Sequence, residues 1–503
     1  MDHDKEPVAG LSAASSCISL SLYLDDKSPS FFPVYTHQCF PEEYIQGWRP
    51  LTRAEENSLQ VYRRWCRNNG IQDPNETSSV FAKHSSYKYV DNQDNRISVN
   101  VLLSPSCQKC KIEAVVSCSN KLEEKPNKSI NSTDEPAAKK TKTVSFEDSG
   151  VKSTEKLSVE DITRKIQPSL PPIEDVTINE MQSTSDLNFL SQPIGEVVKR
   201  YSRKINRGDD SGEDGQFIIT VAKGSDPSVS SYHKAVQPLA RWFIETADDV
   251  NISEEDGGFW SVLYLFREHR GDGPTCQYSL AGYVTLFHFQ SPFRKPQAGI
   301  IVRICQALII PTYQRAGHGS QLLLAVHEYA DRYLNDYADS STGFDIVEVN
   351  VEDPAPGFVA LRDNVDYKRF VSRLDSMADK IENLDSTIHL KKYPVTCKEY
   401  FQPAPDGGLS LSTLLKITKR QAETIIEIYK LDAVERWKES SNDDAKIEQV
   451  ETYYRLMVKK SLRMFRIEEL GACEGGKDEQ KALLAKWFDQ TYNHYRKLLG
   501  LSI

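Results

Sequence analysis

Hydrophobic and polar positions follow a strand-like pattern over three stretches in the middle of the chain. Residues 215–222, 258–269 and 277–290 are rich in β-branched and aromatic residues. Each of these stretches predicts a strand, and the glycine-containing turn between the last two predicts an antiparallel hairpin. Residues 231–249 have a helical pattern despite Pro238, so we expect a helix between the first two strands.

A second pattern, from residue 301 to residue 354, predicts a crossover unit. Residues 301–310 and 343–354 predict strands, and residues 321–333 predict a helix between them. Apolar side chains recur along one face of this helix, at Leu322, Val326, Tyr329, Ala330 and Tyr333. A right-handed crossover makes its two strands parallel. Antiparallel and parallel pairs together predict a mixed α/β sheet.

The composition divides the chain into segments with different expected structure. Residues 1–29 and 104–186 are polar and nearly free of hydrophobic periodicity. We expect both to be disordered, because they bury too little apolar surface to offset the entropy of ordering. Residues 30–103 start with a dense aromatic run and predict a small domain with one short helix and two strands. The sheet occupies residues 187–369, and a helical domain covers residues 370–503.

Amphipathic, charge-rich patterns at residues 417–439 and 447–470 predict the helices of this C-terminal domain. The second helix carries a basic face, which we interpret as an ordinary solvated face, formed by Lys459, Lys460, Arg463 and Arg466.

The composition also bounds the function. No apolar run in the 503 residues approaches the length of about 18 that a membrane helix needs, so no membrane partner is expected. The acidic N-terminus does not look like a secretory signal. Ten cysteines without a disulfide-like spacing indicate a reduced, intracellular protein. The net charge of −10 disfavours direct nucleic-acid binding and favours a basic partner.

Two short motifs lie in the segment that we expect to be disordered. Cys107 and Cys110 form a close pair but lack a fourth ligand at zinc spacing, so we expect free thiols in a flexible segment and no metal. The basic run Lys139-Lys140-Thr141-Lys142 is typical of a nuclear localisation signal, although an ordinary charged cluster is the alternative.

The candidate binding chemistry lies in the loop between the strand at 301–310 and its helix. Gln314, Gly317 and Gly319 form the pattern Q-x-x-G-x-G at the start of that helix. Glycines let backbone N–H groups approach a ligand closely, and a helix N-terminus attracts a pyrophosphate. A plain turn is the alternative. A nucleotide-binding P-loop is disfavoured, because the G-K-[ST] element is missing.

Four blocks in a fixed order make the chain resemble the catalytic subunits of type B histone acetyltransferases, in the GNAT superfamily. They are FFPVYTHQCF, SYHKAVQPLARWFIETA, QALIIPTYQRAGHGSQLL and VNVEDPAPGFVALRD. The resemblance implies a GNAT core and a histone acetyltransferase of the nucleus and cytoplasm. It implies acetyl-CoA as co-substrate without a metal, newly synthesised histones (the H4 tail above all) as substrate, and a WD-repeat histone-binding partner. The segment 104–186 is an insertion relative to this pattern.

The resemblance also assigns roles to residues. It implies that a splayed strand holds the pantetheine arm, through Ala307, Leu308 and Ile309. It implies a pyrophosphate loop made of Gln314, Arg315, Ala316, Gly317, His318, Gly319 and Ser320. It implies Glu352 as general base, with Asp353 and Glu245 near it. It implies a surface for the lysine and its peptide, made of Glu42, Glu43, Trp260, Phe287, His288 and Phe289. Phe358 stands where the family often has Tyr.

The residues at the second strand end fit the chemistry of acetyl transfer. A lysine amine has a pKa of about 10.4, so a base must take its proton before it can attack a thioester. Glu352 can do so, and nearby acids would raise its pKa toward the useful range; the alternative is that Glu352 and Asp353 only cap the following segment. We expect a backbone N–H near Leu308 to stabilise the oxyanion. Cys305 is expected to pack as a small hydrophobe, and His318 to pack or to donate to phosphate.

Other function classes stay open at this point. An inactive fold that carries histones as a chaperone would not bind the coenzyme. A GNAT enzyme with another protein or amine substrate is the nearer alternative. The aromatic and acidic block at residues 31–48 favours a basic peptide over a small amine.

Overall fold

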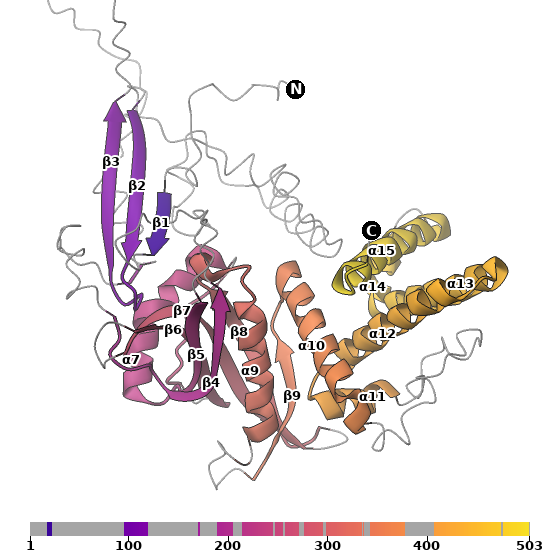
Figure 1. The fold of residues 1–503 in the computed structure, drawn as a ribbon, viewed down its shortest axis with the longest axis horizontal. Helices are drawn as coiled ribbons and strands as arrows, with labels where there is room; N and C mark the ends of the chain where they lie inside the picture. The colour runs from indigo at the N-terminus through magenta and orange to yellow at the C-terminus, as the bar shows by residue number, and fades with distance from the viewer. Residues whose placement is uncertain are drawn as a thin grey trace, which may run out of the picture.

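A six-stranded mixed sheet forms the centre of the protein (Figure 1). The structure is a computed structural model that describes residues 18–22, 95–118, 170–171, 189–204, 214–244, 247–254, 257–270, 276–294, 298–333, 335, 343–377, 407–473 and 476–501. The strands, in spatial order, are β4 (Glu196–Lys204), β5 (Asp214–Lys223), β6 (Phe259–Arg270), β7 (Cys276–Ser291), β8 (Gly299–Ile309) and β9 (Ile346–Val351). Neighbouring strands are antiparallel except β8 and β9, which are parallel. The predicted mixed α/β sheet and its parallel crossover are therefore confirmed.

Strand β4 is the part of this sheet that the sequence did not predict. It is an edge strand, and charged residues interrupt its apolar alternation, at Lys199, Arg200, Arg203 and Lys204. Exposed edge strands commonly carry charges that block pairing with another chain. The same charges remove the periodicity by which a strand is recognised.

Helices cover both faces of the sheet, with α7 and α9 on opposite sides (Figure 1). The helix predicted at 231–249 begins earlier, at Pro227, because Asp226 caps the N–H of Ser228. It is also broken at Pro238 into α7 (Pro227–Val236), the 3-10 turn η5 (Gln237–Leu239) and α8 (Ala240–Phe243), since proline cannot continue the hydrogen-bond ladder.

Helix α9 (His318–Arg332) is the crossover helix between β8 and β9. The five apolar residues predicted along its inner face are all buried: Leu322, Val326, Tyr329, Ala330 and Tyr333. They pack in the main hydrophobic cluster against the sheet. The start of α9 is thereby fixed at the end of β8.

The described residues after β9 are mostly helical. Helix α10 (Pro356–Met377) follows β9 directly. The C-terminal helical unit, as we call it, contains α11 (Gly407–Leu415), α12 (Lys419–Ser440), α13 (Asp444–Phe465), α14 (Ile467–Gly471) and α15 (Gly476–Leu498). Val365 of α10 belongs to the cluster around the sheet, whereas Tyr367 and Phe370 belong to the cluster of the helical unit. The boundary predicted at residue 370 thus falls inside a continuous helix that both cores share.

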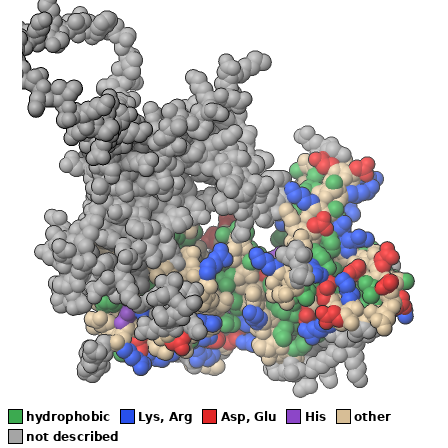
Figure 2. Space-filling view, turned by 45° about the horizontal axis from the view of Figure 1, so that its top comes forward, with side chains coloured by type: hydrophobic (Ala, Val, Ile, Leu, Met, Phe, Trp, Pro, Cys, Tyr) green, Lys and Arg blue, Asp and Glu red, His purple; other side chains and the backbone are tan. Residues whose placement is uncertain are grey.

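On the visible surface of the helical unit, positive, negative and hydrophobic side chains are interspersed (Figure 2). The parts of the unit seen in this view do not gather a single sign of charge over a broad area.

A separate three-stranded sheet lies above the main one, in the order β1 (Ile18–Leu22), β2 (Asn95–Leu103) and β3 (Cys110–Cys118). For residues 104–118 the prediction of disorder is wrong, and the sequence held the signal: apolar residues alternate at Ile112, Ala114 and Val116. The turn before β3 packs against the main core, where Tyr232 donates a hydrogen bond to the carbonyl of Ser106 (2.9 Å).

Cys107 and Cys110 are fully buried in this turn, so they are not thiols of a flexible segment. Burial raises the pKa of Cys110 to about 12. Both thiols therefore act as small core residues.

Candidate active site

The parallel pair β8 and β9 separates before β8 ends. Their register stops at Ile304 and Val351, and the N–H of Glu352 still donates to the carbonyl of Ile304 (3.1 Å). Strand β8 continues to Ile309, while the chain after β9 turns away at Asp353 (φ 35°) and enters α10. The strands therefore splay, and the last residues of β8 face the start of α9 and α10 across the opening.

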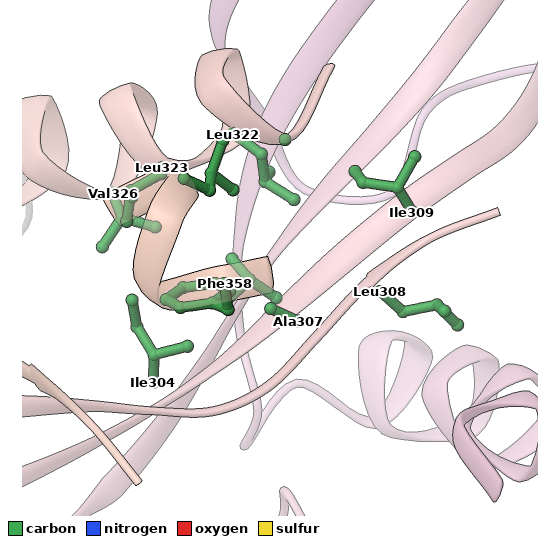
Figure 3. Close-up of a pocket in the computed structure, with 11 residues that line it drawn as sticks. Ile304, Ala307, Leu308, Ile309, Leu322, Leu323, Val326 and Phe358 are labelled. Carbon is green, nitrogen blue, oxygen red and sulfur yellow. The ribbon is translucent and has the colours of Figure 1, made fainter. Parts of the chain in front are cut away.

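An apolar cavity of about 80 Å³ occupies this opening (Figure 3). Its lining comes from β7, β8, α9 and α10 and consists of Val284, Ile304, Ala307, Leu308, Ile309, Gly319, Leu322, Leu323, Val326, Phe358 and Leu361. Ile304, Ala307, Val326 and Phe358 gather around it in Figure 3. Such a narrow, apolar space suits an unbranched chain better than a bulky polar group. The structure thus brings together five residues that the resemblance assigned to the site, namely Ala307, Leu308, Ile309, Gly319 and Phe358.

The backbone of β8 presents polar groups at the same place. The N–H of Ile310 donates to the carbonyl of Ala281, and the N–H of Gln306 donates to Thr285 Oγ1, both toward β7. Successive N–H groups of a strand alternate in direction, so those of Ala307 and Ile309 point into the splay. The donor expected near Leu308 is therefore supplied by its neighbours, because its own N–H points toward β7.

The loop at residues 311–320 contains two left-handed residues just before α9. Arg315 (φ 62°) and Gly317 (φ 83°) are both left-handed, and α9 begins at His318. The first N–H groups of a helix lack partners within the helix, so the start of α9 is a candidate site for an anion. Gln314 ties the loop to the end of β8, since its Nε2 donates to the carbonyl of Ile309 (2.9 Å). Gly319 packs closely against α10, because a Cβ there would lie 3.1 Å from a methyl group of Leu361.

His318 is a packing residue of this loop. Its ring is buried, lies 4.3 Å from the Phe217 ring centroid, and makes a 2.8 Å hydrogen bond from Nδ1 to the hydroxyl of Tyr201. Burial, together with the nearby positive charge of Arg203, lowers the pKa of His318 to about 4. The burial of the ring and its contacts with Phe217 and Tyr201 favour packing, the first of the two roles expected for His318.

Arg203 is a site residue that the sequence did not reveal. It lies on the unpredicted strand β4, and its guanidinium would be 3.6 Å from a Cβ placed on Gly317. No described carboxylate lies within ion-pair distance of Arg203. The motif around Gly317 cannot point to it, because the two residues are far apart in the sequence and meet only through the sheet.

The predicted base lies on the other side of the splay. The side chain of Glu352 is 56% exposed, and its Oε1 is 3.9 Å from Arg303 Nη1. Arg303 is aligned in register with Phe287 and lies over the ring of Phe289 (5.2 Å). A cation is therefore one charged neighbour of Glu352, whereas Glu245, one of the acids predicted beside it, lies outside the described residues.

Aromatic side chains extend from this point across the same face of the sheet. Trp260 is paired with Phe287 across β6 and β7, and their rings are 4.8 Å apart. Phe287 stacks on Phe289 at 6.2 Å. All three are only partly buried. They form an aromatic row that leads along the sheet toward Arg303 and Glu352.

His288 does not belong to this surface. It alternates to the opposite face, is completely buried beneath α9, and makes a 3.0 Å hydrogen bond to the hydroxyl of Tyr329. Burial lowers its pKa to about 4. Its expected contact with a peptide is therefore contradicted, for the simple reason that neighbouring residues of a strand face opposite sides.

Three of the acids predicted for the site, Glu42, Glu43 and Glu245, lie outside the described residues. Asp353 is exposed beside Glu352. Cys305 is partly buried, and burial together with the charge of Glu352 raises the pKa of its thiol to about 12, so it is a poor nucleophile.

The described residues contain no group of three or more His, Cys, Asp or Glu that could hold a metal ion. None of the described helices is long and apolar enough to span a membrane.

A comparison with known protein families finds a match to part of the chain. The family described as "Histone acetyl transferase HAT1 N-terminus" matches residues 137–245. The matched range begins within residues 104–186, which we expected to be an inserted linker. It ends at Glu245, before β6.

Several curated proteins are similar to larger parts of the chain. The chain is 29% identical to the histone acetyltransferase type B catalytic subunit of Rattus norvegicus, over 42% of this chain and 45% of the relative. It is 28% identical to one from Dictyostelium discoideum, over 40% and 39%. It is 27% identical to one from Cryptococcus neoformans, over 62% and 70%. The matches thus span less than half the length of the first two relatives.

The splayed parallel strands and the glycine turn lie after the residues that the family model matches. Over part of its length, the chain is similar to the catalytic subunits of type B histone acetyltransferases.

Proposed function

We propose that the protein is a GNAT-like protein-lysine acetyltransferase that transfers the acetyl group of acetyl-CoA to histone lysines. The observation that carries this proposal is the splay between β8 and β9. It combines an apolar cavity lined by Ala307 and Phe358, a left-handed glycine turn at Gly317, and an exposed carboxylate at Glu352. A turn without a binding role would not require these three features to occur together.

The coenzyme side of the splay is formed by β8 and α9. The N–H groups after Gly317 and the guanidinium of Arg203 suit a pyrophosphate. The cavity suits a pantetheine arm, and the N–H groups of Ala307 and Ile309 are placed to bond to amides or to a developing oxyanion. The bound coenzyme would supply the activated acetyl thioester, and these residues bind and orient it.

The acceptor side is formed by Glu352 and the aromatic row. A lysine ε-amine is protonated at neutral pH, with a pKa of about 10.4. Glu352 would accept this proton, and its place is fixed by the hydrogen bond from its own N–H to Ile304. The neutral amine can then attack the thioester directly, without a cysteine intermediate. Trp260 and Phe287 suit the apolar stem of the lysine side chain.

The expected physiological substrate is the H4 tail of newly synthesised histones. Supporting arguments are the names of the relatives, the net charge of −10, and the acidic pair Glu42 and Glu43 in the N-terminal segment. A WD-repeat histone-binding subunit is the partner that the family resemblance implies. The basic run at residues 139–142 would direct a fraction of the protein to the nucleus, which the distribution of a tagged protein lacking this run would test.

The decisive experiment combines calorimetry with mass spectrometry. The purified chain should bind acetyl-CoA, and core histones incubated with both should gain acetyl groups on lysines of the H4 tail. Coenzyme binding without histone acetylation would favour a GNAT enzyme for another protein or amine. Histone binding without coenzyme binding would favour a chaperone and would overturn the proposal.

A further inference from the structure

The backbone of the C-terminal helical unit is attached to the outer edge of β9. Lys416, between α11 and α12, has a left-handed backbone (φ 52°). Its carbonyl accepts a hydrogen bond from the N–H of Val349 (2.8 Å), and the next residue, Ile417, forms a parallel bridge with Val349. Strand β9 is the last strand of the sheet, so this bridge supplies the partner that its outer edge lacks.

The side chain of Lys416 ties the same point to two further segments. Its Nζ lies 2.7 Å from the carbonyl oxygen of Ala330, near the end of α9, and 2.9 Å from Asp345 Oδ2, just before β9. The side chain is only 15% exposed. A cation is favourable at a helix C-terminus, where carbonyl groups lack partners. One residue therefore connects the end of α9, the start of β9 and the middle of β9.

A second set of contacts holds α10 against the same elements. Asp366 of α10 lies 3.1 Å from His327 of α9, and both are buried. Arg369 lies 3.4 Å from Asp366 and donates to the carbonyl of Leu415 in α11 (3.2 Å). Helices α9, α10 and α11 are thereby joined by charged groups inside the protein. The attachment of the helical unit at β9 is thus backed by contacts that resist sliding.

We propose that the C-terminal helical unit positions the catalytic strand, with Lys416 as the positioning residue for Glu352. In the residues before Val351, β9 is bonded to β8 on its inner edge and to Lys416 and Ile417 on its outer edge. Glu352 follows directly, and its N–H still donates to the carbonyl of Ile304 in β8. On the outer edge the last attachment among the described residues is at Val349, so the location of Glu352 relative to the splay depends also on how firmly Val349 is held. This inference rests on the proposed role of Glu352.

The test is Lys416→Met, which keeps the length of the side chain but removes its charge. A misplacement of about 1 Å can cost a catalytic group about 10²-fold, so we expect kcat to fall between about tenfold and a hundredfold. The Kd for acetyl-CoA should stay unchanged, because the coenzyme loop lies at the opposite end of α9 from Ala330. Lys416→Arg keeps the cation and should recover part of the turnover.

A double-mutant cycle with Glu352→Gln separates positioning from general destabilisation. If Lys416 acts through Glu352, Lys416→Met should reduce kcat in the native background and cause little further loss in the Glu352→Gln background. Additive losses, or a coenzyme Kd that rises in step with the loss of kcat, would overturn the inference. If Glu352→Gln alone leaves kcat unchanged, the proposed base fails, which is a separate outcome.

Two further variants serve as a control and as a substitute for Lys416→Met. Lys460→Met, at an exposed lysine of α13, controls for the loss of a lysine charge from the helical unit and should leave kcat unchanged. Asp345→Asn weakens one contact of Lys416 while the bond to Ala330 remains, and it serves if Lys416→Met does not fold. It should give a smaller kcat loss with the same dependence on Glu352, and a loss that is equal in both backgrounds would contradict positioning.

Discussion

Replacing Gly317 with glutamate should abolish coenzyme binding while the protein stays folded. Gly317 is left-handed (φ 83°), and its nearest neighbour outside the loop is the guanidinium of Arg203, 3.6 Å from the position of an added Cβ. The glutamate would thus enter the space that we assign to the pyrophosphate. Its carboxylate would also pair with Arg203 and cancel the positive charge of this residue beside the loop.

The size of the effect follows from charge repulsion. Two like charges about 4 Å apart at an effective dielectric constant of 20 repel each other by about 4 kcal/mol. Since 1.4 kcal/mol corresponds to about tenfold in affinity, the Kd for acetyl-CoA should rise by about 10³-fold. A non-glycine residue in the left-handed region costs folding about 1–2 kcal/mol, which a protein of this size tolerates.

Two control variants separate charge from backbone strain. Gly317→Ala carries the same left-handed strain without a charge, and it should change the coenzyme Kd only a few-fold. Gly343→Glu places a glutamate at another left-handed glycine (φ 58°) with open space around it, and it should bind coenzyme normally. Isothermal titration with acetyl-CoA and thermal melting would measure both quantities. A folded Gly317→Glu protein with native coenzyme affinity would refute the assignment of the loop.

Three other predictions concern separate parts of the site. Glu352→Gln should lower kcat at pH 7 by about 10²–10⁴-fold with little change in coenzyme Kd, and a pH–rate profile should show a smaller loss as the pH is raised toward the lysine pKa. Near-normal turnover at pH 7 would show that another residue is the base. Arg203→Ala should weaken binding of acetyl-CoA by about tenfold, from the loss of a charge-assisted bond worth about 1.5–3 kcal/mol, without altering kcat at saturation; equal binding by titration would place Arg203 outside the site. Burial lowers the pKa of His233, His288 and His318 from 6.5 to about 4, so the unfolded chain binds more protons than the folded chain and stability should fall as the pH drops from 6.5 toward 4. A His288→Phe variant should lose less Tm over this pH range, and equal slopes of Tm against pH for the variant and the native protein would contradict the argument.

The sequence predicted the crossover unit because its signals are local. The stripe from Leu322 to Tyr333, the apolar run of β8 and the glycines of the loop each span only a few turns or strand residues. Local periodicity and turn chemistry are properties of the chain itself. The aromatic row could also be expected in part, since Phe287 and Phe289 share the strand period of two.

The missed features depend on tertiary contacts. Arg203 reaches the loop only because β4 lies at the sheet edge, and its charged sequence hides the strand. The side to which His288 points required the register of β7, since a shift of one residue exchanges the two faces. The turn at Cys107 is ordered by its contact with Tyr232, far away in the sequence. The junction at Lys416 joins segments that no short motif connects.

The one parallel pair in the sheet explains why the coenzyme loop and the proposed base can act on the same molecule. In parallel neighbours the carboxyl ends emerge at the same edge, so the end of β8 at Ile309 and the end of β9 at Val351 open into one splay. With β9 antiparallel, its carboxyl end would lie at the far end of a strand of 6 residues. At about 3.3 Å per residue this is roughly 20 Å, far beyond the reach of a glutamate side chain. The crossover helix α9 makes the parallel order possible, and the N-terminus of the same helix supplies the anion site. A single βαβ unit therefore fixes both halves of the proposed reaction, and the antiparallel strands support it and present the aromatic row.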